Sequence, residues 1–156
     1  MSAITTSTTS TIRHRVGIGG PRATVFDALA TLPGLASWWT RDVDGDPAVG
    51  GQLRFAFGGP ERVVTMEVVE VEPTSLVVWR CVGGPDEWLD TSFRFELSDA
   101  DGETVLLFVN DGWREPVEFM YHCTTKWGYF LLSLKASLEG GNGTPFPDDL
   151  HISSWN

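Results

Sequence analysis

A chain of 156 residues is long enough to bury a core of its own and short enough to form a single domain. Hydrophobic residues make up 42% of the chain and charged residues 21%, which is the composition of an ordinary globular protein. The formal net charge of −10 would repel phosphate groups, so nucleic acids and anionic membrane surfaces are excluded as expected partners.

The first ten residues and the two cysteines bear on the compartment of the protein. Residues 1–10 are mostly Ser and Thr, which predicts a disordered segment, and they lack the basic start and apolar core of a signal peptide. Cys81 and Cys123 form no metal-binding or redox pattern and have apolar neighbours, so we expect two buried free thiols. Free thiols are typical of a reducing compartment, and together these features predict a cytoplasmic protein without a metal or cofactor.

The chain opens with a predicted strand and two short helical segments. Apolar and polar residues alternate over residues 12–18, as on a half-buried strand. The turn Gly19-Gly20 leads into Pro21, which suits the first turn of a helix that we expect to end near Thr31. Pro33-Gly34 then breaks the chain, and a short turn over residues 35–39 follows.

Residues 53–109 carry the alternation of a β-sheet. Short turns separate strand-like runs at residues 53–57, 63–71, 76–82, 93–97 and 104–109. Short connections between consecutive strands predict an antiparallel meander. Charged residues set the facing, because Glu67 and Arg80 should point to water and their apolar neighbours inward.

A long amphipathic helix is predicted over residues 118–138. Its apolar residues recur at steps of three and four and form one stripe: Met120, Cys123, Trp127, Leu131, Leu134 and Leu138. Gly140 and Gly141 end this helix. Such a stripe needs a surface to cover, so we predict an α+β fold in which a curved antiparallel β-sheet wraps around the long C-terminal helix. The domain is expected over residues 11–141, followed by an irregular tail at 142–156.

Five short motifs occur in order along this layout. They are residues 36–40 (ASWWT), 50–55 (GGQLRF), 69–79 (VEVEPTSLVVW), 110–113 (NDGW) and 126–128 (KWG). With the order of elements, they resemble the SRPBCC (START-like) superfamily and its helix-grip fold, in the branch named for the activator of heat-shock-protein-90 ATPase. The last motif departs from the family pattern, since Trp precedes Gly here. The resemblance covers about residues 12–140.

The resemblance implies a cavity between sheet and helix that binds lipids, hormones, polyketides or other apolar molecules. The inward positions above would then line a pocket for a small apolar or aromatic ligand. The residues expected to line it are Trp38, Trp39, Met66, Val68, Trp79, Cys81, Phe93, Phe95, Trp113, Trp127 and Leu131. The alternative is that these side chains fill the space solidly, because periodicity does not detect voids.

Two other functions stay open at this point. An enzyme of the same fold, similar to a polyketide cyclase, would use Asp111, Asp90 or His14 as its acid or base. A co-chaperone-type interaction module would need an exposed apolar patch, and a homodimer is compatible with the sequence. Glu115, Glu118 and His122 are spaced by three and four residues, which could suit a metal ion. The helical wheel turns His122 away from the apolar stripe, so we expect a solvent-facing pair of Glu118 and His122 rather than a metal site.

Overall fold

The computed structural model describes residues 8–156. Most of the predicted disordered segment 1–10 lies outside these described residues, and Ser10 already belongs to the first strand. In chain order the elements are β1 (Ser10–Ile18), α1 (Arg22–Ala30), α2 (Leu32–Ala36), β2 (Asp42–Gly45), β3 (Gln52–Ala56), β4 (Val63–Glu72), β5 (Leu76–Gly83), the 3₁₀ turn η1 (Asp86–Trp88), β6 (Ser92–Ala100), β7 (Glu103–Trp113) and α3 (Glu118–Leu138).

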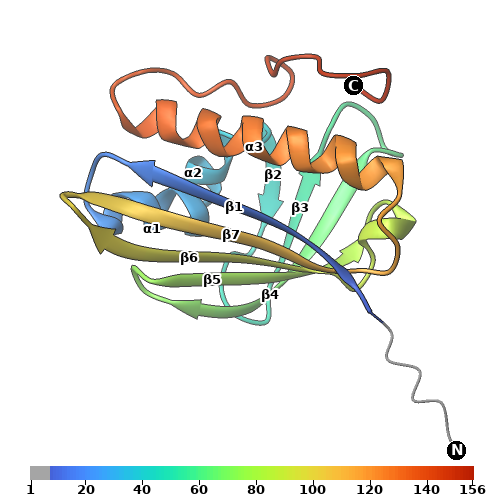
Figure 1. Cartoon of the computed structure of the whole chain (residues 1–156), viewed down its shortest axis with the longest axis horizontal. Helices are drawn as coiled ribbons and strands as arrows, with labels where there is room; N and C mark the ends of the chain where they lie inside the picture. The colour runs from blue at the N-terminus through green and yellow to red at the C-terminus, as the bar shows by residue number, and fades with distance from the viewer. Residues whose placement is uncertain (1–7) are drawn as a thin grey trace, which may run out of the picture.

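Within residues 8–156 the strands form one seven-stranded antiparallel sheet in the order β1-β7-β6-β5-β4-β3-β2. The meander β2 to β7 follows chain order, and β1 joins it beside β7. Figure 1 shows the sheet curving beneath α3, which crosses its concave face. The α+β fold with two short helices after the first strand is therefore confirmed.

Register and burial confirm the predicted facing of the central strands. Met66, Val68 and Trp79 are buried, and their strands pair with Met66 opposite Cys81 and Val68 opposite Trp79. On the other face, Arg80 forms an ion pair with Glu67. A shift of register between Val68 and Glu70 inserts an extra residue in β4, and such bulges bend the strand that carries them.

Three local features differ from the predicted elements. The short edge strand β2 was not predicted, because its sequence Asp-Val-Asp-Gly offers one apolar residue among acids. Pro33 lies in the first turn of α2 rather than at a break, and the Thr31 hydroxyl caps this helix by accepting a hydrogen bond from Gly34 N. Strand β7 was predicted to end at residue 109 but continues to Trp113. The polar residue Asn110 is accommodated inside the fold because its side chain has hydrogen-bond partners there.

The partners of Asn110 show how a polar residue occupies an inward position. Its amide Nδ2 donates to Ser92 O at 3.0 Å and to Thr91 Oγ1 at 3.3 Å, while its Oδ1 accepts the indole N–H of Trp113 at 2.7 Å. Each buried polar atom of the side chain is thereby satisfied. The NDGW motif is thus a structural junction that fixes Trp113 at the end of the sheet.

The C-terminal tail, residues 140–156, folds back along α3 (Figure 1). Phe146 forms a parallel bridge to Thr40, with Phe146 N donating to Trp39 O at 2.9 Å. Farther along, Asp149 pairs with Lys126 of α3. The tail forms no helix or extended strand, and it covers part of the domain.

Candidate functional site

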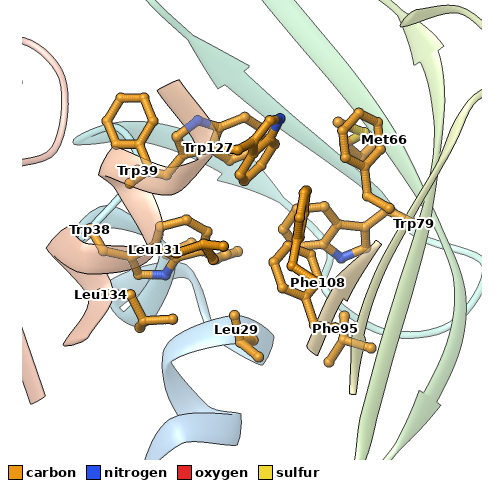
Figure 2. Packing of buried hydrophobic residues seen from close by; sticks show 14 of the residues in the cluster. Leu29, Trp38, Trp39, Met66, Trp79, Phe95, Phe108, Trp127, Leu131 and Leu134 are labelled. Atoms are coloured by element: carbon orange, nitrogen blue, oxygen red, sulfur yellow. The ribbon is translucent and has the colours of Figure 1, made fainter. Parts of the chain in front are cut away.

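The space directly between the sheet and α3 is filled by side chains. All eleven residues predicted to line a pocket are buried: Trp38, Trp39, Met66, Val68, Trp79, Cys81, Phe93, Phe95, Trp113, Trp127 and Leu131. Their rings contact one another, with centroids 4.8 Å apart for Trp79 and Phe95 and 6.0 Å for Trp39 and Trp79. Figure 2 shows these rings and the leucines of α3 meeting across the interior.

A cavity of about 460 Å³ lies at one end of this packed interior. It is bounded by the first half of α3, the β3–β4 turn, the loop from β5 to η1, and the C-terminal tail. Of the eleven predicted residues, Trp39 and Trp127 line it. Among the described residues, its wall contains eight Trp or Phe side chains: Trp39, Phe57, Trp88, Phe119, Trp127, Phe130, Phe146 and Trp155. We call this space the aromatic cavity.

Helix α3 supplies one wall of the aromatic cavity through its periodicity. Phe119, Cys123, Trp127 and Phe130 follow one another at steps of four, four and three, so they share a helix face that is turned to the cavity. Trp127 stands at the border of the two regions, with its ring centroid 4.5 Å from that of Phe108 in the filled interior. The cavity therefore borders the packed core on its inner side, while its outer side is partly open to solvent.

The buried charges of the wall are paired with each other. Lys126 Nζ lies 2.5 Å from Asp149 Oδ2, and the two side chains are 12% and 4% exposed. The same ammonium donates to Leu150 O at 2.6 Å and to Asn156 Oδ1 at 2.9 Å. Its three N–H groups are thus all used by the tail. A buried pair of this kind leaves no free charge for a ligand on this side of the cavity.

His122 lies beneath the tail, where the helical wheel of the sequence predicted a solvent-facing side chain paired with Glu118. Its Nδ1 shares a hydrogen bond of 2.6 Å with Ser153 Oγ, and its ring is stacked on Phe119. Burial, and then the charge of Lys126, hold the pKa of His122 below its ordinary value. The imidazole is therefore neutral at neutral pH. The tail, which helical periodicity does not describe, accounts for this difference.

The thiols and one indole complete the buried polar groups near the cavity. Burial raises the pKa of Cys123 to about 12 and raises that of Cys81, so neither thiol is a nucleophile at neutral pH. Both are free and buried, as predicted. Trp88 Nε1 is buried without a hydrogen-bond partner among the described residues. Its N–H acts to lower the Cys123 pKa against the larger effect of burial, and sulfur is a weak acceptor.

The three candidate acid or base residues lie elsewhere. Asp111 is exposed and accepts a hydrogen bond from Thr11 Oγ1 at 2.6 Å, and Asp90 is exposed beside Arg80. His14 Nε2 lies 3.2 Å from Thr124 Oγ1 between β1 and α3, where burial lowers its pKa. None of the three is among the described residues that line the aromatic cavity.

Residues 8–156 also bear on metal binding and on membrane insertion. Among residues 8–156, no group of three or more His, Cys, Asp or Glu side chains is arranged to hold a metal ion. In the same part of the chain, no helix is long and apolar enough to cross a membrane.

Comparison with known proteins identifies the family. The sequence matches the family described as activator of Hsp90 ATPase homolog 1-like protein over residues 20–139. The chain belongs to this family. The match ends at the start of the C-terminal tail, so the residues that close the aromatic cavity from outside lie beyond the family region. A comparison with curated proteins found no match.

Solved structures agree with this assignment. The Aha1 dimer from Colwellia psychrerythraea is 38% identical, with a TM-score of 0.79, and the match covers 86% of this chain and 99% of that one. DynU16, a protein in the dynemicin biosynthetic locus, is 22% identical with a TM-score of 0.72, over 87% of this chain and 49% of that one. CalU16 from Micromonospora echinospora is 18% identical with a TM-score of 0.68, over 85% and 78%. The last two likenesses show a shared fold.

Several wall residues were missed by reasoning from sequence. Trp88 lies in a 3₁₀ turn without periodicity, and Phe146, Asp149 and Trp155 lie in the irregular tail. The available signal was compositional, since two aromatic residues in a Gly- and Pro-rich tail need a surface to pack on. That signal predicts packing but does not say where.

Proposed function

We propose that this protein binds a small, uncharged, largely apolar molecule with an aromatic group in the aromatic cavity. The observation that carries the proposal is a hollow of about 460 Å³ whose wall is dominated by Trp and Phe rings. Pockets for small organic molecules measure roughly 300–1,000 Å³ and are mostly apolar with a few polar groups. Aromatic walls favour flat ligands, because rings gain from stacked and edge-to-face contacts.

The charges of the wall favour an uncharged ligand. Lys126 and Asp149 neutralise each other in a buried pair, and His122 is neutral at neutral pH. Glu61 and Arg62 are exposed, so water screens their charges. A charged ligand group would lose its hydration in the cavity without gaining a free partner of opposite charge.

The resemblance and the fold give general support. Proteins with the helix-grip fold are expected to bind apolar molecules, and DynU16, from a biosynthetic locus, shares this fold. At 22% identity that likeness carries no ligand identity to this chain. The enzyme and co-chaperone hypotheses remain predictions from the sequence, and no contact in the aromatic cavity favours either.

A fluorescent probe tests the proposal. N-phenyl-1-naphthylamine is uncharged, apolar and aromatic, and its emission rises when it leaves water. We expect saturable binding by the wild-type protein and loss of binding in Val63→Trp, because Val63 lines the cavity and a larger ring would occupy it. The matched control is Val69→Trp, the same change at an exposed position of the same strand.

The control should bind like the wild type. Equal binding by both variants would place the probe elsewhere and contradict the proposal, as would the absence of saturable binding. A thermal-shift screen of neutral aromatic compounds against the same three proteins would then define the preferred ligand.

We also propose that the chain forms a homodimer and resides in the cytoplasm. The relative from Colwellia psychrerythraea, described as a dimer, supports the first, and the two buried free thiols support the second. Light scattering on a size-exclusion column should give twice the mass of one chain. A monomer mass at every protein concentration would contradict the dimer.

A further inference from the structure

The outer wall of the aromatic cavity is supplied by the last residues of the tail. Phe146, Asp149, Trp155 and Asn156 line it. Asp149 contacts Lys126 and the later residue Ser153 contacts His122, so the tail runs antiparallel to α3. Figure 1 shows the tail running back along this helix. The cavity is partly open to solvent with the tail in place, and removing this segment would widen the opening along the side of α3.

The tail is held in two different ways along its length. The first part is tied by backbone hydrogen bonds, from Phe146 N to Trp39 O at 2.9 Å and from Arg41 N to Phe146 O at 3.2 Å. The last part, residues 149–156, makes no backbone–backbone hydrogen bond to any other described segment. It is attached through side chains, and Trp155 remains half exposed. Segments attached in this way are the ones that open locally at low cost.

One lysine makes most of the polar attachment of residues 149–156. Lys126 Nζ contacts Asp149 Oδ2 at 2.5 Å, Leu150 O at 2.6 Å and Asn156 Oδ1 at 2.9 Å. Asp149 and Asn156 are the first and last residues of the segment, so a single side chain binds both of its ends to α3. The hydrogen bond between His122 and Ser153 adds a second attachment one helical turn away.

We propose that residues 149–156 form a lid that opens as a unit about residues 147–148, with Lys126 as its latch, so that ligands enter and leave the aromatic cavity through this opening. The inference rests on the proposed function, because it describes access to the same cavity. The lid lies outside residues 20–139, the region matched by the family. In the open state the lysine and the aspartate are hydrated separately, and closure narrows the entrance of the cavity.

The test compares two lysines of the same helix. Lys126→Met removes the latch and keeps an unbranched side chain of similar length. Lys135→Met is the control, because Lys135 pairs with Glu139 and donates to Gly17 O, and it is not among the described residues that line the cavity. The rate of iodoacetamide alkylation of Cys123, which lines the cavity and is 4% exposed, reports opening of the lid without any ligand. Stopped-flow fluorescence with N-phenyl-1-naphthylamine reports access to the cavity.

In Lys126→Met we expect Cys123 to be alkylated faster by about tenfold or more, which corresponds to about 1.4 kcal/mol. Probe association and dissociation should both accelerate by a similar factor, because the open state widens the entrance. Alkylation of Cys81, which is buried and is not among the described residues that line the cavity, should stay unchanged, and Lys135→Met should behave like the wild type. Asp149→Asn removes the charge from the lid side alone and should reproduce the same changes, even if Lys126→Met does not fold.

Unchanged alkylation of Cys123 in both latch variants would show that Lys126 does not hold the lid. Faster alkylation with unchanged probe kinetics would show that ligands enter by another route, and either result overturns the inference. If the wild type binds no probe, the proposed function fails and the gating role fails with it, while the alkylation rates still decide whether Lys126 holds residues 149–156.

Discussion

Two regions of this molecule contain the same kinds of residue, but one is filled by side chains and the other surrounds a cavity. Between β5, β6 and the second half of α3, aromatic rings fill the interior, as the 0% exposure of Phe95 and Leu134 shows. Between the β3–β4 turn, η1 and the first half of α3, similar rings surround a cavity of about 460 Å³. Trp127 contacts both regions. Aromatic content alone therefore does not decide between a solid core and a cavity.

The difference comes from what closes each region. The filled interior lies between a hydrogen-bonded sheet and a helix, two regular layers that approach until their side chains interlock. The aromatic cavity has one irregular wall, the tail, whose distance from the sheet is set by the polar contacts of Lys126 and His122. A wall fixed by polar contacts keeps its distance instead of collapsing onto the rings.

The largest expected effect comes from emptying the filled interior. Trp79→Ala would remove a ring that is 1% exposed and packed against Trp39 and Phe95. We expect the free energy of unfolding to fall by about 3–5 kcal/mol, measured by urea denaturation. The neighbouring surface change Arg80→Ala is the control and should cost less than about 1 kcal/mol. A loss for Trp79→Ala no larger than the control would show that this region is not solidly packed.

A smaller loss is expected from the polar junction at the end of the same interior. Asn110→Ala would leave the buried indole N–H of Trp113 without its acceptor at 2.7 Å. The expected cost is about 1–3 kcal/mol in the free energy of unfolding. Asp111→Ala, at the exposed neighbouring position, should be close to neutral. If both variants were equally stable, the hydrogen bonds of Asn110 would not contribute to stability.

At the cavity wall, a substitution should reduce ligand binding more than it reduces stability. Phe57 is partly buried and its ring meets those of Trp39 and Phe146, with centroids 5.4 and 5.7 Å away. We expect Phe57→Ala to lower the free energy of unfolding by about 1 kcal/mol, because part of its surface is already hydrated. Probe affinity should fall by about tenfold or more. A stability loss as large as that of Trp79→Ala with normal probe binding would remove the distinction between the two regions.

The smallest effect concerns pH. Burial lowers the pKa of His122 in the folded protein, so between that value and the ordinary value of about 6.5 the unfolded chain binds more protons. Stability should therefore decrease as pH falls below about 6.5, and the loss should stop below the folded-state pKa. Ser153 and Lys126 are the polar groups that act on the ring, and His14 contributes a loss of the same sign.

Urea denaturation between about pH 8 and about pH 5 checks this prediction, since the lowered pKa of Glu139 acts at more acidic values. His122→Asn, which retains a polar side chain, should show a smaller decrease than the wild type. An identical decrease in both proteins would assign the pH dependence to other groups.

Much of the fold could be predicted because it follows from local patterns. Alternation in β4 and β5 set which side chains face inward, and the charged residues Glu67 and Arg80 do meet on the outer face. The bounds of α3 follow from its apolar stripe and from the glycines after it. Strand β2 could not be predicted, because its pairing with β3 depends on a neighbour and not on its own sequence.

The candidate site was predicted less completely. Inward facing identified buried residues, including Trp39 and Trp127 of the cavity wall, but it could not separate rings that touch from rings that border a space. The tail residues and Trp88 have no periodicity to interpret. The orientation of His122 was set by a segment some thirty residues away, about which helical periodicity carries no information.

The amino-acid sequence by itself determined the order of elements, the family and the two faces of each central strand, because these depend on periodicity and on the free energy of burying apolar side chains. The tertiary structure decided where the chain leaves space, which rings surround it, and that the tail lies over it. Those features depend on distances between segments far apart in sequence, and such distances are fixed only when the layers and the tail pack together.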